Sequence, residues 1–264
     1  MGWIAGLDIG SSSSKAVLMQ DNTLVAHSIL TTEGHFSNAA DAVLNAVLDA
    51  ANLRPNNLDL IGASGLGAAF IPYPSKKISD IACHSRGANF YQPSARTLIE
   101  IGNQLSRVIK ITPQGRVAGC TTGDKCAAGS GRILQIVARV LQVKLEDLGP
   151  ISMASKQPAK FTTGCAVFLE TEAVSRVAEG IPIEDIIAGL HQALANKIAV
   201  MAHKMKVEED CAIIGGGALN IGLVKIVEEK IQKRLFIPEE PLLSGAVGAA
   251  LIAAERSAED GHLE

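Results

Sequence analysis

Apolar residues at the start of the chain predict three consecutive β-strands. These strands cover residues 4–9, 15–19 and 24–30, and short glycine–serine and aspartate–asparagine turns separate them, as in an antiparallel meander. Apolar positions then recur every three or four residues across residues 39–51, which predicts an amphipathic helix. A strand and a second helix complete this half of the chain, at residues 58–62 and 79–91.

The same order of elements returns in the second half and indicates a weak internal repeat. The expected strands are residues 97–101, 107–111, 116–120 and 211–214. The expected helices are residues 130–141, 166–178, 183–206 and 244–255. Three strands followed by helices that cover a mixed sheet, twice over, predict an α/β protein with two domains facing a cleft.

We expect the domain boundary near residue 93. The first domain would comprise residues 1–93 and the second residues 94–240, and the final segment, residues 241–264, would pack back onto the first domain. A chain of 264 residues is long enough for each domain to bury a core of its own.

Composition narrows the range of functions. With 47% apolar and 19% charged residues the chain is globular rather than disordered. Only 3% of the residues are aromatic and the formal net charge is -3, so a nucleic-acid partner is not expected. The longest apolar run, residues 242–254, is shorter than the ~20 residues of a membrane-spanning helix. Because Asp8 interrupts the first apolar stretch early, a secretory signal is not expected, and we predict a cytoplasmic protein without a membrane partner.

The turn between the first two strands is a candidate phosphate-binding segment. It reads DIGSSSSK at residues 8–15, so a glycine permits close backbone approach and several hydroxyl and amide groups can face an anion. The candidate binding residues are Gly10, Ser11, Ser12, Ser13 and Lys15. It is not a Walker loop, because the Gly-Lys-Ser/Thr at a helix start is missing, and a simple polar hairpin is the alternative explanation.

Two later segments have similar character. The matching turn of the second half places Glu100 at a strand end, followed by Gly102 and Gln104. A third segment, Gly215, Gly216 and Gly217, follows an apolar strand and precedes a helix, where a nucleoside or phosphate can bind. Each alone could be only a tight turn. Together they occur in the order and spacing of the acetate kinase, Hsp70 and actin superfamily, which favours binding of ATP or ADP.

Five cysteines in a cytoplasmic chain of this size do not form a disulfide framework, so a special role would be redox or metal binding. Cys126 and Cys165 each lie in a loop of small residues at the start of a predicted helix, where the helix dipole favours a thiolate. Iron-sulfur clusters usually need four thiolates, so two per chain would require a two-fold dimer. The alternatives are ordinary buried cysteines and, less suited to the spacing, a zinc site. Cys83 and His84 are predicted to be structural or supporting residues, and Cys120, which ends a strand, and Cys211, which begins one, are predicted to lie in the core.

Four segments give the chain its resemblance to a known family. They are DKCAAGSGR at residues 124–132, CAVFLETE at 165–172, GGGA at 215–218 and SGAVGAA at 244–250. Through them nearly the whole chain resembles the BadF/BadG/BcrA/BcrD-type ATPase components, which activate 2-hydroxyacyl-CoA dehydratases and drive benzoyl-CoA reductases. The resemblance implies two RNase H-like domains of the acetate kinase, Hsp70 and actin superfamily, facing a nucleotide cleft.

The resemblance also implies cofactors and partners. One 4Fe-4S cluster would be held by Cys126 and Cys165 from each of two subunits, and ATP, Mg²⁺ and an electron donor such as ferredoxin or flavodoxin would be required. Nucleotide binding and hydrolysis would shift the helices after the two cysteines, and an electron would pass to a dehydratase or reductase component. Asp8, Glu100 and Gln104 are the candidate catalytic residues, and Asp8 and Gln104 are expected to organise magnesium or the attacking water.

The second turn departs from the family pattern. Familiar activators read Asp-Ile-Gly-Gly-Gln-Asp where this chain has EIGNQL at residues 100–105, so Glu100 is longer by one methylene and Leu105 replaces an acid. Some benzoyl-CoA reductase ATPase subunits also lack the full motif, and in those the cluster lies between two different subunits. Three alternatives stay open. The first is a redox ATPase, either a homodimer or a heterodimer with a more complete paralogue. The second is a metabolite kinase of the same fold that uses a carboxylate as base. The third is a protein that binds ATP without cleaving it, either a nucleotide sensor or scaffold or a subunit paired with an active paralogue.

Overall fold

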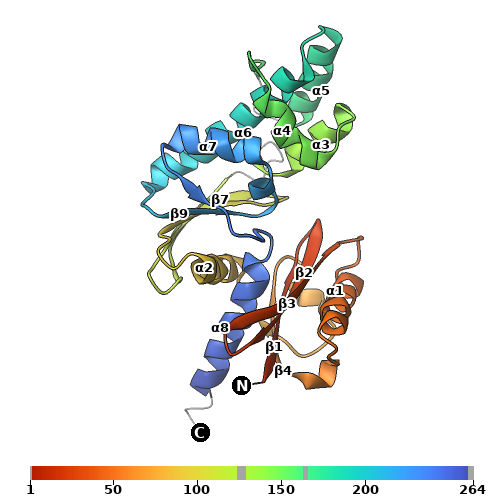
Figure 1. Cartoon of the computed structure of the whole chain (residues 1–264), viewed down its shortest axis with the longest axis vertical. Helices are drawn as coiled ribbons and strands as arrows, with labels where there is room; N and C mark the ends of the chain where they lie inside the picture. The colour runs from red at the N-terminus through yellow and green to blue at the C-terminus, as the bar shows by residue number, and fades with distance from the viewer. Residues whose placement is uncertain (1, 124–128, 163–165, 261–264) are drawn as a thin grey trace. The chain divides into compact units, whose positions relative to one another are not determined.

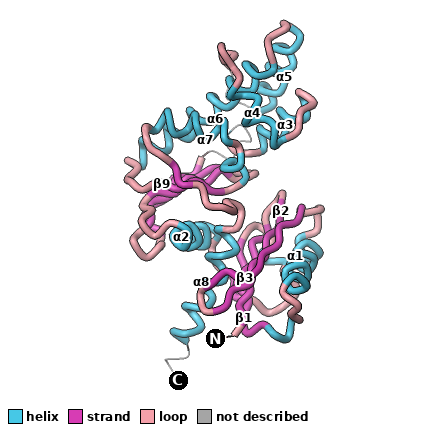
Figure 2. The backbone as a smooth tube through the Cα atoms, in the orientation of Figure 1, coloured by secondary structure: helices cyan, strands magenta, loops and turns pink. Residues whose placement is uncertain are grey.

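The computed structural model describes residues 2–123, 129–162 and 166–260, and the chain divides into two compact units (Figures 1 and 2). The first unit contains residues 1–94, 111–117 and 242–264, and the second contains residues 95–110 and 118–241. Each unit holds one five-stranded mixed sheet. The predicted α/β architecture, with one mixed sheet in each of two units, is confirmed.

The sheet of the first unit has the order β3-β2-β1-β4-β5. β1 and β2 are antiparallel, as are β2 and β3, whereas β4 and β5 continue the sheet in parallel. The elements of this unit are β1 (Trp3–Ile9), β2 (Ser13–Gln20), β3 (Thr23–Thr31), α1 (Phe36–Ala50), β4 (Leu58–Ser64), β5 (Lys76–Lys77), α2 (Asp80–Tyr91) and α8 (Ser244–Asp260). All the strands and helices predicted here are present, and only the two-residue β5 was not foreseen.

Helices cover both faces of the first sheet. The side chains of β2 show this, because they point alternately to one face and to the other. Ala16 and Leu18 point to the core beneath α1, while Val17 and Met19 point to the core beneath α8. All four side chains are at most 2% exposed. A strand that is apolar on both faces is therefore explained by one helix on each side, which Figure 1 shows for α1 and α8.

Helix α8 packs unusually close to its neighbours because glycines line its contacts. A Cβ built on Gly6 of β1 would lie 2.0 Å from the carbonyl oxygen of Ala246, and one on Gly62 of β4 would lie 2.1 Å from that of Ala249. On the helix itself, a Cβ on Gly248 would lie 1.8 Å from the carbonyl oxygen of Cys83 in α2. Backbone meets backbone at these points, so no side chain larger than hydrogen fits.

The second unit repeats this topology, with the sheet order β10-β9-β6-β7-β8. Its elements are β6 (Thr97–Ile101), β7 (Ser106–Ile111), β8 (Val117–Thr122), α3 (Arg132–Val140), α4 (Leu148–Met153), α5 (Ala166–Ala178), α6 (Ile183–Met205), β9 (Cys211–Ile214), α7 (Ile221–Ile231) and β10 (Leu235–Phe236). In both units three meander strands come first, and the next long strand, β4 or β9, then lies parallel to the first strand of the meander, β1 or β6. The internal repeat inferred from the sequence is therefore a repeat of sheet topology.

One core joins β6, β7 and β9 to the helices α3 to α7. Helix α6 contributes its whole inner face, because Ile187, Leu190, Leu194 and Ile198 recur at helical spacing and are at most 3% exposed. Helix α4 was not predicted, since six residues are too few to show helical periodicity.

His191 lies in this core without any exposed surface. The Asn220 amide contacts its Nε2 at 3.0 Å, and the Asn220 carbonyl oxygen accepts a bond from the Leu223 amide, so the amide nitrogen is the donor to the ring. Burial lowers the pKa of His191 to about 4. The folded protein therefore keeps this imidazole neutral where the unfolded chain already binds a proton.

Acid is expected to destabilise the second unit through His191. The unfolded side chain titrates near 6.5 and the folded one near 4, so its contribution is complete above pH 6.5 and is lost as the pH falls towards 4. The total over that window is about 3 kcal/mol. His191→Gln should flatten the pH dependence of the unfolding free energy between pH 6.5 and 4, measured by urea unfolding. The exposed His27→Gln is the control, and an equal flattening in that variant would contradict the assignment.

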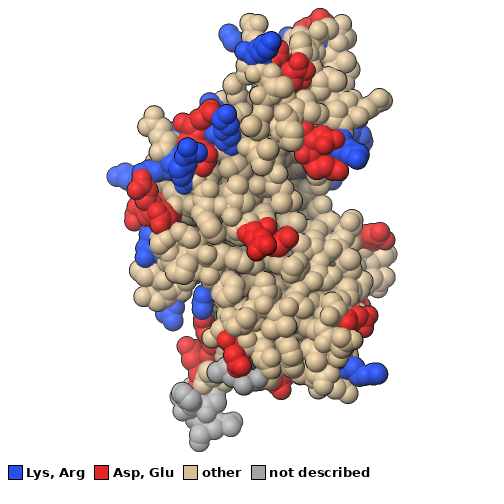
Figure 3. Space-filling view, in the orientation of Figure 1, with Lys and Arg blue, Asp and Glu red and all other residues tan. Residues whose placement is uncertain are grey.

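Among the described residues, no helix combines the length and apolar content needed to cross a bilayer. On the face shown in Figure 3, acidic and basic side chains are interleaved over the surface. Several form exposed or partly exposed ion pairs, such as Arg86 with Glu255 and Lys233 with Glu209. Such pairs contribute roughly 0–1 kcal/mol each, so the cores rather than surface charges stabilise the two units.

Candidate functional site

The first polar turn carries a buried acid–base pair. Asp8 near the end of β1 lies directly opposite Lys15 of β2, and the Lys15 Nζ is 3.2 Å from the Asp8 Oδ2. Asp8 is 4% exposed and Lys15 is 8% exposed. The Lys15 ammonium also donates a hydrogen bond to the Ser13 carbonyl oxygen. A single ammonium on a flexible stem can pair with this carboxylate and still turn to a bound phosphate.

Backbone hydrogen bonds shape the turn between these two residues. The Gly10 amide donates to the Ser13 carbonyl at 3.1 Å, and the Thr32 hydroxyl donates to the Gly10 carbonyl at 2.9 Å. Ser11, Ser12 and Ser13 are half-buried. A Cβ on Gly10 would lie 2.8 Å from the Ser13 oxygen and 3.2 Å from the Lys15 Nζ, so glycine is needed for this close turn. The predicted serine-rich turn therefore brings hydroxyl groups, an ammonium and a carboxylate together.

Three groups beside Asp8 come from distant parts of the sequence and were not predicted as site residues. A Cβ on Gly245 would lie 2.8 Å from the Asp8 Oδ2 and 2.9 Å from the His84 Cε1, so both side chains border this glycine. The His84 Nδ1 is 3.1 Å from the Ser244 hydroxyl at the start of α8. The apolar run assigned Ser244 and Gly245 to a buried helix, and only the tertiary structure places Gly245 beside Asp8 and Ser244 beside His84.

The second turn has the same backbone geometry. The Gly102 amide donates to the Leu105 carbonyl at 3.0 Å, matching the bond from Gly10 to Ser13. Gln104 is exposed on this turn. Glu100 lies directly opposite Arg107 of β7, and the guanidinium contacts both carboxylate oxygens, at 2.7 Å from Nε and 3.0 Å from Nη2. Arg107 was not among the predicted site residues, although it follows Glu100 by the interval that separates Lys15 from Asp8.

The second turn is bonded to the beginning of α3. The Gly131 amide donates to the Gly102 carbonyl at 2.8 Å, and the Arg132 amide donates to the Asn103 carbonyl at 3.1 Å. The Ser130 hydroxyl donates to the same Asn103 carbonyl at 3.0 Å. These three bonds connect the second turn directly to the start of the helix that follows Cys126.

The glycine segment after β9 packs against the same turn. β9 runs parallel to β6, which brings Gly215 close to Ile101. Gly215 has a φ of +83°, and a Cβ there would lie 2.6 Å from the Ile101 carbonyl oxygen. A Cβ on Gly217 would lie 2.3 Å from the Ile101 side chain, whereas Gly216 is exposed with nothing within 4 Å of its Cβ position. Gly216 is thus open to a ligand, while its neighbours require glycine for packing and backbone conformation.

The helix after the glycine segment begins later than expected. The glycines form a short 3-10 turn, Gly216–Leu219, and α7 begins at Ile221. Asn220 is its N-cap and its side chain accepts a hydrogen bond from the Leu223 amide. The glycine segment therefore does not lead directly into the helix, and the Asn220 side chain already occupies one of the free amides of α7.

The cysteines separate into three groups. Cys126 and Cys165, predicted to hold a cluster, lie outside the described residues. Cys83 and Cys211 are buried, and burial raises the pKa of Cys83 to about 12 and also raises that of Cys211, so both are neutral thiols in the cores. Cys120 is exposed on β8, so its predicted core position was wrong. The cause is that the side chains of β8 alternate between exposed and half-buried positions.

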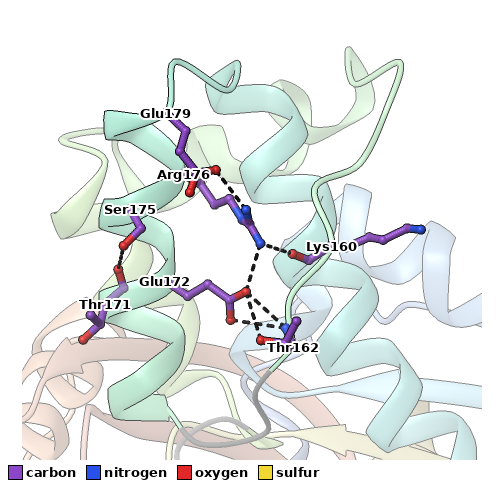
Figure 4. A network of polar contacts seen from close by, with 7 residues as sticks. All are labelled: Lys160, Thr162, Thr171, Glu172, Ser175, Arg176 and Glu179. Carbon is purple, nitrogen blue, oxygen red and sulfur yellow. Dashed lines mark hydrogen bonds and ion pairs between the residues drawn. The ribbon is translucent and has the colours of Figure 1, made fainter.

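A polar network attaches the segment before Cys165 to helix α5 (Figure 4). The Thr162 amide donates to both carboxylate oxygens of Glu172, at 3.2 Å each. Arg176 contacts the same carboxylate at 3.2 Å and donates to the Lys160 carbonyl at 3.1 Å. The backbone at residues 160–162 is therefore held on the helix that follows Cys165.

The two turns differ in the groups that they offer to a magnesium ion. Mg²⁺ commonly binds one or two carboxylates together with phosphate oxygens and water, and the first turn offers Asp8 and serine hydroxyl groups. In the second turn both Glu100 oxygens contact Arg107, and Leu105 carries no polar group. Within the described parts of the chain, no group of three or more His, Cys, Asp or Glu residues is arranged to hold a metal by itself.

Sequence comparison identifies relatives over almost the full chain. The model of the BadF/BadG/BcrA/BcrD ATPase family matches residues 5–253. A 2-hydroxyisocaproyl-CoA dehydratase activator from Clostridioides difficile is 34% identical over 254 residues, which is 96% of each chain. A benzoyl-CoA reductase component from Thauera aromatica is 29% identical over 264 residues, 96% of this chain and 93% of that one.

Structural comparison agrees. The activator of the 2-hydroxyisocaproyl-CoA dehydratase from Clostridium difficile with bound ADPNP has a TM-score of 0.94 and is 33% identical, and the match covers 99% of this chain and 98% of the activator. A ROK family glucokinase from Streptomyces griseus has a TM-score of 0.58 over 96% of this chain and all of its own. At 12% identity that likeness concerns the fold alone. The predicted α/β fold class, with two domains that each contain a mixed sheet, is confirmed.

Proposed function

Because the chain belongs to the BadF/BadG/BcrA/BcrD ATPase family, we propose that it is an ATP-hydrolysing electron-transfer component of the cytoplasm. It would activate or reduce a partner enzyme of the 2-hydroxyacyl-CoA dehydratase or benzoyl-CoA reductase type, as the names of its relatives suggest. The observation that carries the proposal is the set of hydrogen bonds from residues 130–132 to the turn at Gly102 and Asn103. These bonds link the turn that would bind the nucleotide to the helix that follows Cys126.

Both polar turns and the glycine segment would bind the nucleotide. Ser11, Ser12, Ser13 and Lys15 of the first turn and the backbone of the second turn would contact the phosphates, and Gly216 would lie against the nucleoside. Asp8 would hold Mg²⁺, and Gln104, exposed on its turn, would orient the attacking water. The ADPNP bound to the similar activator supports a nucleotide of this class.

Cys126 and Cys165 would hold a 4Fe-4S cluster together with the same two residues of a second subunit. The cluster would supply one-electron redox chemistry at low potential when bound. Such a cluster cannot be completed by two thiolates, so a dimer partner, either a second copy or a paralogous subunit, is part of the proposal. Ferredoxin or flavodoxin would be the electron donor.

The coupling would use the bonded segments of the second unit. When the turn after β6 responds to the γ-phosphate, the amides of Gly131 and Arg132 move with the carbonyl groups that they contact. Glu172 and Arg176 would keep the segment before Cys165 attached to α5 during this motion. The helices after both cysteines would therefore change position together with the nucleotide state.

The test is anaerobic purification of the wild-type protein and of Cys126→Ser and Cys165→Ser. We expect the wild-type protein to contain one cluster per pair of chains by iron and sulfide analysis, with an electron paramagnetic resonance signal after reduction with dithionite. Each variant should lose iron, while Cys120→Ser, at an exposed position on β8, should retain it. A colourless wild-type dimer, or full iron content in both cluster variants, would contradict the proposal.

One observation favours a second candidate function. Because both Glu100 oxygens contact Arg107 and Leu105 carries no polar group, this chain could bind ATP without hydrolysing it and act beside a more complete paralogue. ADPNP binding by a preparation that releases no phosphate alone, but does so when mixed with the paralogue, would support this function.

A further inference from the structure

The two polar turns carry acid–base pairs at equivalent positions. In the first unit, Asp8 of β1 is the register partner of Lys15 of β2. In the second unit, Glu100 of β6 is the register partner of Arg107 of β7. The two sheets have the same topology. An equivalent glycine amide closes each turn: Gly10 donates to the Ser13 carbonyl, and Gly102 donates to the Leu105 carbonyl. The pairs are therefore structural counterparts, and their differences can be compared directly.

The pairs differ in how tightly the base holds the acid. The Lys15 ammonium makes its contact at 3.2 Å and also donates to the Ser13 backbone. The Arg107 guanidinium contacts both oxygens of Glu100, and both side chains are 6% exposed. A planar guanidinium matches a carboxylate in this two-point geometry, which a lysine cannot do. Glu100 is therefore held much more firmly than Asp8.

We propose that Arg107 is a positioning residue that withholds the Glu100 carboxylate from cation binding, so that Asp8 serves the magnesium–nucleotide complex without a second acid. This inference rests on the proposed function, because it concerns the same nucleotide. The extra methylene of Glu100 lets its carboxylate reach the guanidinium, and Leu105 supplies no replacement ligand. A cation at the second turn would have to displace a buried, two-point ion pair. The second turn then binds phosphate through its backbone rather than through a metal.

The experiment weakens the hold on Glu100 and measures what Mg²⁺ contributes to nucleotide affinity. The quantity is the ratio of the ADPNP dissociation constants without and with Mg²⁺, measured by calorimetry on the complete chain. Arg107→Lys gives Glu100 a one-point partner like that of Asp8, and the ratio should rise at least ~3-fold as a carboxylate becomes available to the cation. The gain should disappear in the double variant Arg107→Lys/Glu100→Gln. Conversely, Lys15→Arg gives Asp8 a two-point partner and should lower the ratio.

Lys110→Arg is the matched control, because Lys110 lies on the same strand and pairs with Glu208 at the surface. Its ratio should equal that of the wild-type protein. If Arg107→Lys fails to fold, Glu100→Asp takes its place, since the shorter acid cannot keep both contacts and the ratio should again rise. An unchanged or lowered ratio in a folded variant overturns the inference but leaves the proposed function intact. Absence of ADPNP binding by the wild-type protein overturns both.

Discussion

Asp8→Asn is expected to slow ATP hydrolysis by on the order of 10²-fold. The carboxylate is 4% exposed at the end of β1, and the amide that replaces it can neither balance the Lys15 charge nor hold a magnesium ion well. Since Ser11, Ser12, Ser13 and the glycine segment remain, ADPNP affinity should fall by a smaller factor. Single-turnover phosphate release and ADPNP titration on the same preparation separate the two effects.

Asp21→Asn is the control for this substitution. Asp21 lies in the turn between β2 and β3 with a φ of 50°, a conformation that asparagine adopts readily, so the change should leave hydrolysis as it is. Equal hydrolysis in Asp8→Asn and the wild-type protein would remove Asp8 from the proposed mechanism. A parallel loss of ADPNP binding would instead make Asp8 a general binding residue.

Gly248→Val is expected to prevent α8 from packing in the first unit. Even the first carbon of the side chain would lie 1.8 Å from the Cys83 carbonyl oxygen and 2.5 Å from its carbonyl carbon, and neither atom can move without displacing α2. Overpacking of this kind costs about 3 kcal/mol or more. For a chain of this size the thermal midpoint should fall by roughly 6–12 °C. Thermal unfolding followed by circular dichroism measures the change.

Gly119→Ala serves as the comparison. The added carbon would lie 3.4 Å from the end of the flexible Met205 side chain, so a small adjustment can accommodate it. The midpoint of this variant should stay close to that of the wild-type protein. If Gly248→Val melted at the wild-type temperature, the close contact between α8 and α2 would be shown not to stabilise the fold.

Sequence patterns were sufficient to predict the elements whose residue pattern is confined to a short stretch of the chain. The meander strands and the long helices followed from periodicity, and the two turns followed from glycines placed between an acidic strand end and polar residues. Helix α4 and the two-residue strands β5 and β10 were not predicted, because they are too short to show a periodic pattern of apolar residues. Cys120 was misplaced because the strand that carries it is largely exposed.

For the candidate site, the sequence identified which turns carry acids but not what surrounds each acid. Arg107 was visible at the interval that relates Lys15 to Asp8, yet its two-point contact with Glu100 depends on the length of both side chains and on the strand register. The environment of Asp8 depends on Gly245, which is more than two hundred residues away in the chain.

The amino-acid sequence by itself determined the order of the elements, the internal repeat, the family and the turns that bear polar groups. Each of these depends on residues that are neighbours in the chain, where spacing and residue type act directly on the backbone. The tertiary structure decided which base holds Glu100 with two contacts, which glycines allow α8 to approach α2, and which residues border Asp8. Contacts between distant segments depend on how the sheets and helices pack, and small differences in side-chain reach then decide whether an acid is held or available.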